Sequence, residues 1–373
     1  MAATVTKAGP YFASGEISFS SLRTNFKETS SGSISASELR RNTSVTDKNP
    51  IVPDATENAS ISTGNNLAIS QFRNSIKYYY ITQTGTDTNF DIGAQSWNSN
   101  LNKNILKWMY MNGAVGSSTS SAAAILSSTA HNLTIDVSGS ILGSGGRGGG
   151  QAGAPDPSGE SGGNGLNINS SGANNIVVFV RNTANIYGGG GGGERGKTGA
   201  NGANGTCVES SRTQGCGDRP GCPGGFSEVG QWNGGCCQST SYCCGFFNCG
   251  CERCVRNLQG RYCERRTTLN GGVGGTGGIG GNARGYNNQS GSISGGSGSS
   301  GSGSTSTCPG TQSPSPGAGQ NGERGGDGGD YGQAGQSTDN TGSGGAAGRA
   351  ISGSNYSVTG TLNTSTIKGL YNP

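Results

Sequence analysis

The sequence predicts a mostly β protein built on polyglycine II helices, with little α-helix. Two tracts, residues 143–205 and 271–348, hold most of the 74 glycines. Short strand-like runs lead directly into glycine, and all of the 12 cysteines except Cys308 lie between residues 207 and 263. Because only 29% of the residues are apolar, one large hydrophobic core is excluded.

The glycine tracts allow three interpretations. A collagen triple helix needs glycine at every third position and abundant proline, whereas the chain has 11 prolines and broken triplets. A flexible linker is the usual state of Gly/Ser-rich chain. The spacing of glycine pairs around Gly272, Gly275 and Gly278 gives two glycine faces and one outward side chain per three-residue turn, which favours packed polyglycine II helices.

The N-terminal region, residues 1–75, contains an internal repeat. Residues 15–26 and 32–43 align with each other, and residues 67–74 give a weaker third copy. Each copy predicts an extended piece, an N-cap and one helical turn that points an apolar residue inward. A single turn must dock on something, so we predict docking residues here, with purely structural capped turns as the alternative. The predicted residues are Ile17, Leu22, Arg23, Ile34, Leu39 and Arg40.

The doubled pattern G-x-I-S-x-S-x-L-R resembles a motif near the start of tail and fibre proteins of tailed bacteriophages. The resemblance implies that residues 1–75 join the chain to other virion tail proteins. Fibre proteins are commonly homotrimers, so a homo-oligomer, with a trimer favoured, is expected.

Residues 76–132 are predicted to form a small β region. Its strand-like runs are 76–81, which includes three consecutive tyrosines, and 105–111. The tyrosines could form a sugar-stacking platform, although core or interface packing is the commoner role of such residues.

Strand-like runs that end in glycine occur at 133–143, 176–188 and 356–369. This layout predicts stacked strand-plus-glycine-helix repeats in two regions, 133–206 and 267–373. This order of strand-like runs and glycine tracts resembles the glycine-rich distal adhesins of some bacteriophages. In those adhesins, loops between stacked polyglycine II helices carry receptor specificity. No individual receptor-binding residue can be transferred from that resemblance.

A cysteine-rich insertion, residues 207–266, interrupts the second half. Such a density of cysteines holds a small segment together, usually by disulfides, although thiolate metal sites or free thiols are alternatives. The single histidine, His131, lies outside the insertion, and no metal or cofactor is predicted. A bridge from Cys308 back to the insertion would tie the second glycine tract to it. The predicted disulfide cysteines are Cys207, Cys216, Cys222, Cys236, Cys237, Cys243, Cys244, Cys249, Cys251, Cys254, Cys263 and Cys308.

Aromatic and arginine side chains accompany these cysteines. Both types anchor protein interfaces, so part of the insertion is a candidate surface for contact with a host. The candidate residues are Trp232, Tyr242, Phe246, Phe247, Arg253 and Arg256.

Together these patterns predict a structural virion protein, made in the host cytoplasm and located in the phage tail. It would be a tail fibre or fibre-tip adhesin that contacts a host receptor, a glycan or an outer-membrane protein. The net charge of +4 has no basic run that would bind nucleic acid, and neither a signal peptide nor a membrane-spanning segment is expected. No catalytic constellation stands out, so the chain is not expected to be an enzyme, and a fibre-borne glycan depolymerase is the weakest reading. The alternatives are a cellular glycine-rich scaffold and a buried tail or baseplate subunit.

Overall fold

The computed structural model describes residues 4–8, 16–28, 31–44, 47, 50–152, 154–172, 174–243, 250–288 and 293–371. The chain divides into two compact units. Unit 1 contains residues 1–196, 278–297 and 324–373, and unit 2 contains residues 197–277 and 298–323.

The prediction of a mostly β chain with little α-helix is confirmed. In the part of the chain that the structure describes, helical structure is confined to four short elements of unit 1. They are α1 (Phe19–Leu22), the π-helical η1 (Arg23–Lys27) and the 3-10 helices η2 (Thr56–Asn58) and η3 (Ile69–Phe72).

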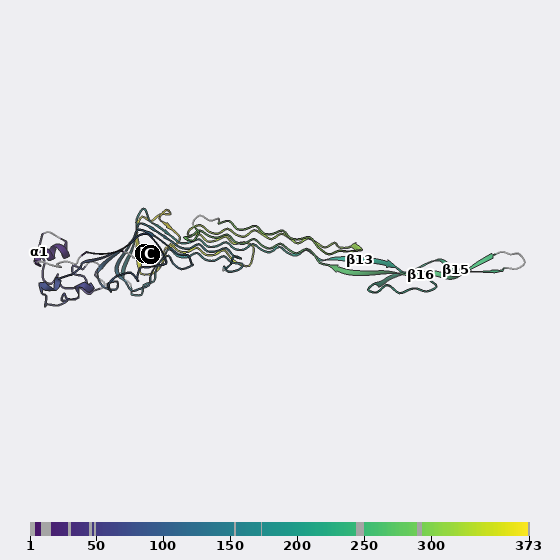
Figure 1. Ribbon diagram of the computed structural model, residues 1–373, viewed down its shortest axis with the longest axis horizontal. Coiled ribbons are helices and arrows are strands. Elements are labelled where there is room, and N and C mark those ends of the chain that lie inside the picture. Colours follow the sequence, from purple (N-terminus) through teal and green to yellow (C-terminus); the bar gives the residue numbers. More distant parts are fainter. Residues whose placement is uncertain are drawn as a thin grey trace. The chain divides into compact units, whose positions relative to one another are not determined.

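Unit 1 contains a coil in which successive turns of the chain add strands to three sheets (Figure 1). The strands, turn by turn, are β2 (Tyr78–Gln83), β3 (Thr86–Thr88) and β4 (Phe90–Asp91); β5 (Leu106–Met111), β6 (Ala114–Gly116) and β7 (Ala124–Leu126); β8 (His131–Val137), β9 (Ser140–Leu142) and β10 (Leu166–Ile168); β11 (Asn174–Val180), β12 (Asn185–Tyr187) and β18 (Ile351–Gly353); and β19 (Tyr356–Gly360) and β20 (Ile367–Lys368). All neighbouring strands of the coil are parallel, and β1 (Thr4–Ala8) adds an antiparallel edge beside β2.

The interior of the coil is a stack of apolar side chains in register. Ile81, Met109, Ile135 and Val178 lie opposite one another on successive strands of the first sheet and are fully buried. Alternate residues point inward because the side-chain period of a strand is two. The regions 76–132 and 133–206, which were predicted to be separate, therefore contribute to one continuous core, so the expectation that a large hydrophobic core is excluded was wrong.

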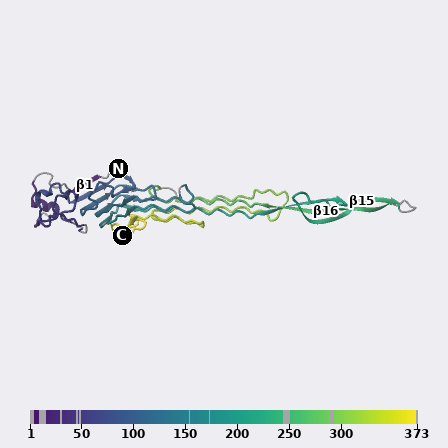
Figure 2. The ribbon, with the colours of Figure 1, turned by 90° about the horizontal axis from the view of Figure 1, so that it is seen from below.

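Two excursions leave this coil at the same place, between a strand of the second sheet and the next strand of the third. Residues 143–165 separate β9 from β10 in the third turn, and residues 188–350 separate β12 from β18 in the fourth. The strands of the coil lie side by side in the view of Figure 2. The glycine tracts are thus insertions into one corner of the coil.

In unit 1 the segment 188–196 is surrounded by other glycine-rich segments. Its N–H groups donate in turn to three of them: 190, 193 and 196 to segment 278–284; 189, 192 and 195 to segment 157–163; and 191 and 194 to segment 333–336. Its carbonyl groups accept from three more: segments 143–149, 326–332 and 345–348. Residues three apart in segment 188–196 therefore bond to the same neighbouring segment, and the segment has backbone neighbours on every side.

The close packing of other segments around residues 188–196 explains the run of consecutive glycines at 188–193. A Cβ atom built on any of these residues would overlap a backbone carbonyl of a neighbouring segment, for example that of Gly345 in the case of Gly191. Outer segments can carry a side chain at one position of three, which faces solvent, as at Ile279. Glycine is required here by the close approach of backbones.

Unit 2 has two parts. Its glycine-rich segments bond in the same three-residue step, with Gly199 and Gly202 donating to the carbonyls of Gly275 and Gly272. Its strands form an antiparallel sheet, β13 (Gly205–Arg212), β14 (Gly215–Cys216), β15 (Ser227–Cys243), β16 (Gly250–Leu269) and β17 (Thr311–Gln312). We call residues 205–269, which contain β13 to β16, the cysteine hairpin.

Candidate functional site

The three N-terminal repeats fold into turns closed by the same hydrogen bond. The N–H groups of Ser18, Ser35 and Ala68 donate to the side chains three residues later, at 3.0 Å to Ser21 Oγ, 2.7 Å to Glu38 Oε2 and 3.0 Å to Gln71 Oε1. In the first two copies the serine hydroxyl also accepts a bond from the N–H of that later residue, which completes a capping box. The third copy has alanine at the cap and keeps half of the motif.

Burial follows the same pattern in all three copies. Leu22, Leu39 and Phe72 occupy equivalent positions, are fully buried and meet in one cluster, against which Ile17 and Ile34 pack. The apolar residues predicted for attachment therefore build a core within this chain. The exposed apolar residues are at another position of the repeat, where Phe19 is 53% and Ile69 39% exposed.

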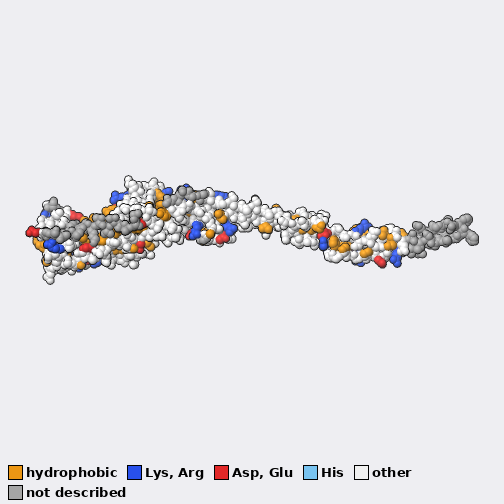
Figure 3. Space-filling model, in the orientation of Figure 1, with side chains coloured by type: hydrophobic (Ala, Val, Ile, Leu, Met, Phe, Trp, Pro, Cys, Tyr) orange, Lys and Arg blue, Asp and Glu red, His pale blue; other side chains and the backbone are white. Residues whose placement is uncertain are grey.

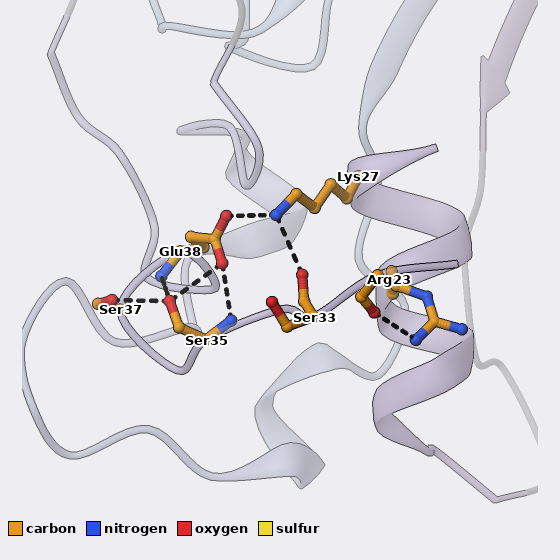
Figure 4. A network of polar contacts seen from close by, with 7 residues as sticks. Arg23, Lys27, Ser33, Ser35, Ser37 and Glu38 are labelled. Atoms are coloured by element: carbon orange, nitrogen blue, oxygen red, sulfur yellow. Dashed lines mark hydrogen bonds and ion pairs between the residues drawn. The ribbon is translucent and has the colours of Figure 1, made fainter. Parts of the chain in front are cut away.

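The predicted arginines link one copy to the next. Arg23 donates to the carbonyl of Gly32 at 2.9 Å, and Arg40 donates to Asn65 Oδ1. Gly32 and Asn65 each lie two residues before the first apolar residue of the following copy, so the two links are equivalent. Figure 4 shows the first of these arginines beside the second copy.

An ion pair reinforces the contact between the first and second copies. Lys27 Nζ lies 2.6 Å from Glu38 Oε1 and also donates to the carbonyl of Ser33 at 3.1 Å (Figure 4). The hydrogen bond from Lys27, together with those from the N–H and hydroxyl of Ser35, lowers the pKa of Glu38 to about 2. The carboxylate is therefore charged at any physiological pH.

A polar cavity of about 490 Å³ adjoins the second copy. Its lining includes Arg40, Arg41 and Glu38, and Arg41 is held by Asp54 at 3.1 Å. Because Glu38, Arg40 and Arg41 in its wall already have partners within the chain, we assign no ligand to it.

The cysteine hairpin is a narrow sheet with almost no apolar interior. Among its described residues the buried apolar side chains are Cys207, Cys263 and Leu269. Three disulfides are described in unit 2: Cys207–Cys308, Cys216–Cys237 and Cys222–Cys263. Cys236 is also disulfide-bonded. The described residues contain no group of three or more His, Cys, Asp or Glu side chains that could hold a metal ion.

Several predicted residues cannot be placed. Cys244, Phe246, Phe247 and Cys249 lie outside the described residues, and for Tyr242, Cys243, Cys251, Arg253 and Cys254 only the backbone is described. Arg256 is exposed on β16. The predicted contact surface can therefore be assessed around Trp232.

Trp232 is part of a stacked group on one face of the hairpin. The guanidinium carbon of Arg212 lies 3.6 Å from the centre of the Trp232 ring and 5.7 Å from that of Tyr262. Arg212 and Gly230 flank Tyr262 on the two neighbouring strands, and Trp232 lies opposite Gly260. A Cβ atom at Gly260 would overlap the Trp232 ring, so glycine lets the indole lie against the strand.

The sequence predicts Trp232 as a contact residue but does not mark Arg212 and Tyr262 as its companions. They come from three different strands, and only the strand register brings them together. The signal available in the sequence was the set of glycines at 230 and 260, which leave room for aromatic rings in a narrow sheet. Figure 3 shows hydrophobic and basic side chains mixed on the surface of the hairpin.

The consecutive tyrosines of β2 take two roles. Tyr79 is buried in the core of the coil, and its hydroxyl donates to the carbonyl of Ser96 at 2.7 Å. Tyr78 and Tyr80 are half-buried on the outer face, where Tyr80 stacks on Trp108 with ring centres 5.2 Å apart. Rings stacked on one another in this way cover their own faces.

Part of the chain matches a known protein family. Residues 77–248 match the family model described as phage tail fibre adhesin Gp38, which confirms the resemblance to tailed-phage tail fibre adhesins. No curated protein and no solved structure shows a significant match to the chain. Among the described helices, we find none with the length and apolar character needed to cross a membrane.

Proposed function

We propose that the chain is a virion tail protein that contacts the surface of the host cell, because its residues 77–248 match the family model of phage tail fibre adhesins. The family match is the observation that carries this proposal. It covers most of the coil, the first glycine tract and most of the cysteine hairpin, which are the parts that such a protein would display.

The N-terminal repeats are proposed to attach the chain to other tail proteins. Their three equivalent turns surround one core and are linked from copy to copy by Arg23 and Arg40. A single chain with three similar turns fits a partner that has threefold symmetry. The exposed Phe19 and Ile69 occupy the same position of the repeat and are the contacts we propose.

This fit favours one copy of the chain on a trimeric partner, whereas the sequence led us to expect a homotrimer of the chain itself. The mass of the intact chain and of its complex in the tail, measured by native mass spectrometry, distinguishes the two. A Phe19→Glu, Ile69→Glu double variant is expected to fold but to be missing from virions. An unchanged copy number in virions would contradict the assigned contacts.

The glycine segments are proposed to be packed polyglycine II helices that support the cysteine hairpin. Support comes from the three-residue step of the hydrogen bonds and from the backbone neighbours on every side of residues 188–196. Such a bundle is rigid without a hydrophobic core, because its backbone groups satisfy one another.

The test of host contact uses the purified chain and the bacterium on which the virion grows. The chain is expected to bind these cells and to block adsorption of the virion in proportion to its concentration. A variant in which a short turn replaces the cysteine hairpin is the matched control and should do neither. Failure of the intact, folded chain to bind cells would favour the alternative of a tail subunit buried away from the host.

A further inference from the structure

Arg212 lies against aromatic rings, and no described residue forms an ion pair with it. Its guanidinium stacks on Trp232, and no described residue forms an ion pair or a hydrogen bond with it. The side chain is exposed. A guanidinium carries five N–H donors in a fixed plane, and stacking leaves all of them directed outward along the edge of that plane.

Other arginines of the hairpin differ in this respect. Arg261, Arg265 and Arg266 form ion pairs with Glu228, Glu209 and Glu264. Arg219 bonds to the neutral side chains of Gln231 and Asn233. Glu228, Glu209 and Glu264 are therefore already paired with a cation within the hairpin.

The surface beside Arg212 is open and apolar. Tyr262 is 45% exposed, and the residue opposite it on β15 is Gly230, which has no side chain to cover the ring. A Cβ atom built on Gly230 would meet only Tyr262, at 3.6 Å. Val229, the residue before Gly230 on β15, is 55% exposed.

We propose that this face binds an anionic saccharide of the host surface, with its phosphate or carboxylate group on Arg212 and a sugar ring against Tyr262. The planar guanidinium fork matches both anions in a bidentate manner. The apolar C–H face of a sugar ring fits an exposed aromatic ring next to a glycine. The proposal rests on the proposed function and names the ligand class of its contact surface.

Stacking on Trp232 also prepares the Arg212 guanidinium for binding the anion. Trp232 fixes the guanidinium before binding, since its indole N–H is anchored to the carbonyl of Thr213 at 3.2 Å and its ring lies over Gly260. Less side-chain entropy is then lost when the anion arrives. Lysine at this position would keep the charge but lose both the fork and the stacking.

The experiment measures binding of the full chain to immobilised lipopolysaccharide from the bacterium that the virion adsorbs to. Three forms are compared: native, dephosphorylated, and carboxyl-reduced. Arg212→Ala and Arg212→Gln are expected to lower affinity for the native form about tenfold or more, the usual effect of losing charge-assisted hydrogen bonds. Arg266→Ala, which removes an exposed arginine from the same sheet, should change it less than about twofold.

The chemical forms identify the anion. Loss of wild-type binding on dephosphorylation assigns phosphate, and loss on carboxyl reduction assigns carboxylate. Peptide mapping without reductant checks that the disulfides of each variant are intact. Equal losses for the Arg212 and Arg266 variants, or full binding to lipopolysaccharide stripped of both anions, would overturn the proposal. If whole cells still bind the chain in that case, the proposed function stands and only the saccharide assignment falls.

Discussion

Glu38 is the residue through which pH acts on the N-terminal repeats. Its carboxylate accepts bonds from Lys27 and from the N–H of Ser35, which lowers its pKa to about 2 from an ordinary 4.5. A carboxyl group with a depressed pKa stabilises the fold above its unfolded pKa, and this stabilisation is lost as the pH falls through the folded value.

We therefore expect the repeats to loosen between about pH 4.5 and pH 2. Hydrogen exchange of the amides around Leu39 should report this loss, and Glu38→Gln should remove the pH dependence in that window. Protection already lower at neutral pH is expected for the variant, because a neutral amide attracts Lys27 less. Superimposable acid profiles of the two proteins would contradict the role given to Glu38.

Glycine positions in the bundle are not equivalent. A Cβ atom at Gly275 would overlap the carbonyl of Ser299, whereas one at Gly303 would meet nothing within 4 Å. Gly275→Val is expected to lower the free energy of unfolding by about 1–3 kcal/mol, since the neighbouring backbone has no room to move. Gly303→Val should change it by less than about 0.5 kcal/mol. Thermal melting of the two variants measures the difference, and equal melting temperatures would mean that the glycine tracts are flexible linkers.

The sequence predicts which side chains of the repeats point inward, but not what they contact. Leu22 and Leu39 were correctly placed on inward-facing turns, because capping serines and a single apolar residue define such a turn locally. In the structure they pack against each other and against Phe72. These contacts join different copies and could not be predicted from one copy alone. Tyr79 and its neighbours show the same limit, since a run of three tyrosines does not reveal which one points into a core.

Among the elements, the cysteine hairpin depends most on covalent links. Its long strands β15 and β16 pair with each other, but among the side chains that the structure describes on them the buried apolar ones are Cys263 and Leu269. Each disulfide contributes about 2–4 kcal/mol by constraining the unfolded chain. Reduction is therefore expected to release the hairpin while the glycine segments persist.

Hydrogen exchange before and after reduction measures this separation of stabilities. Intact mass after alkylation without reductant should show no modification of the described bonded cysteines, such as Cys207 and Cys308. Twelve alkylated thiols, or stoichiometric zinc or iron in the purified chain, would contradict the disulfide assignment.

Elements of the coil were predictable where they are long. β5, β8 and β11 coincide with runs of strand-forming residues that the sequence shows plainly. The second and third sheets consist of strands of two or three residues, such as β3 and β6, which are too short for periodicity to mark. The three-sided coil was therefore missed, although five of the six strands of its first sheet, all except β1, overlap predicted strand-like runs.

At the scale of the molecule, the proposed contact surface on the cysteine hairpin can be removed without removing the coil and the glycine segments. Gly205 and Leu269, at the two ends of the hairpin, pair directly across the sheet. An Asn-Gly turn in place of residues 206–268, combined with Cys308→Ser, is expected to leave the coil and glycine segments folded. Virions carrying this variant should contain the protein in normal amount but fail to adsorb. Normal adsorption would move host contact away from the hairpin.

The path of the chain through the fourth turn of the coil has a consequence for the order of folding. β12 ends at Tyr187 and β18, its successor in that turn, begins only at Ile351. During synthesis the ribosome must complete both glycine tracts and the hairpin before this turn can close. Closing so long a loop is slow, because its entropy is lost before its contacts form. We expect pulse-labelled refolding to protect β5 and β8 early and β18 last, and simultaneous protection of all three would argue that the coil assembles as one unit.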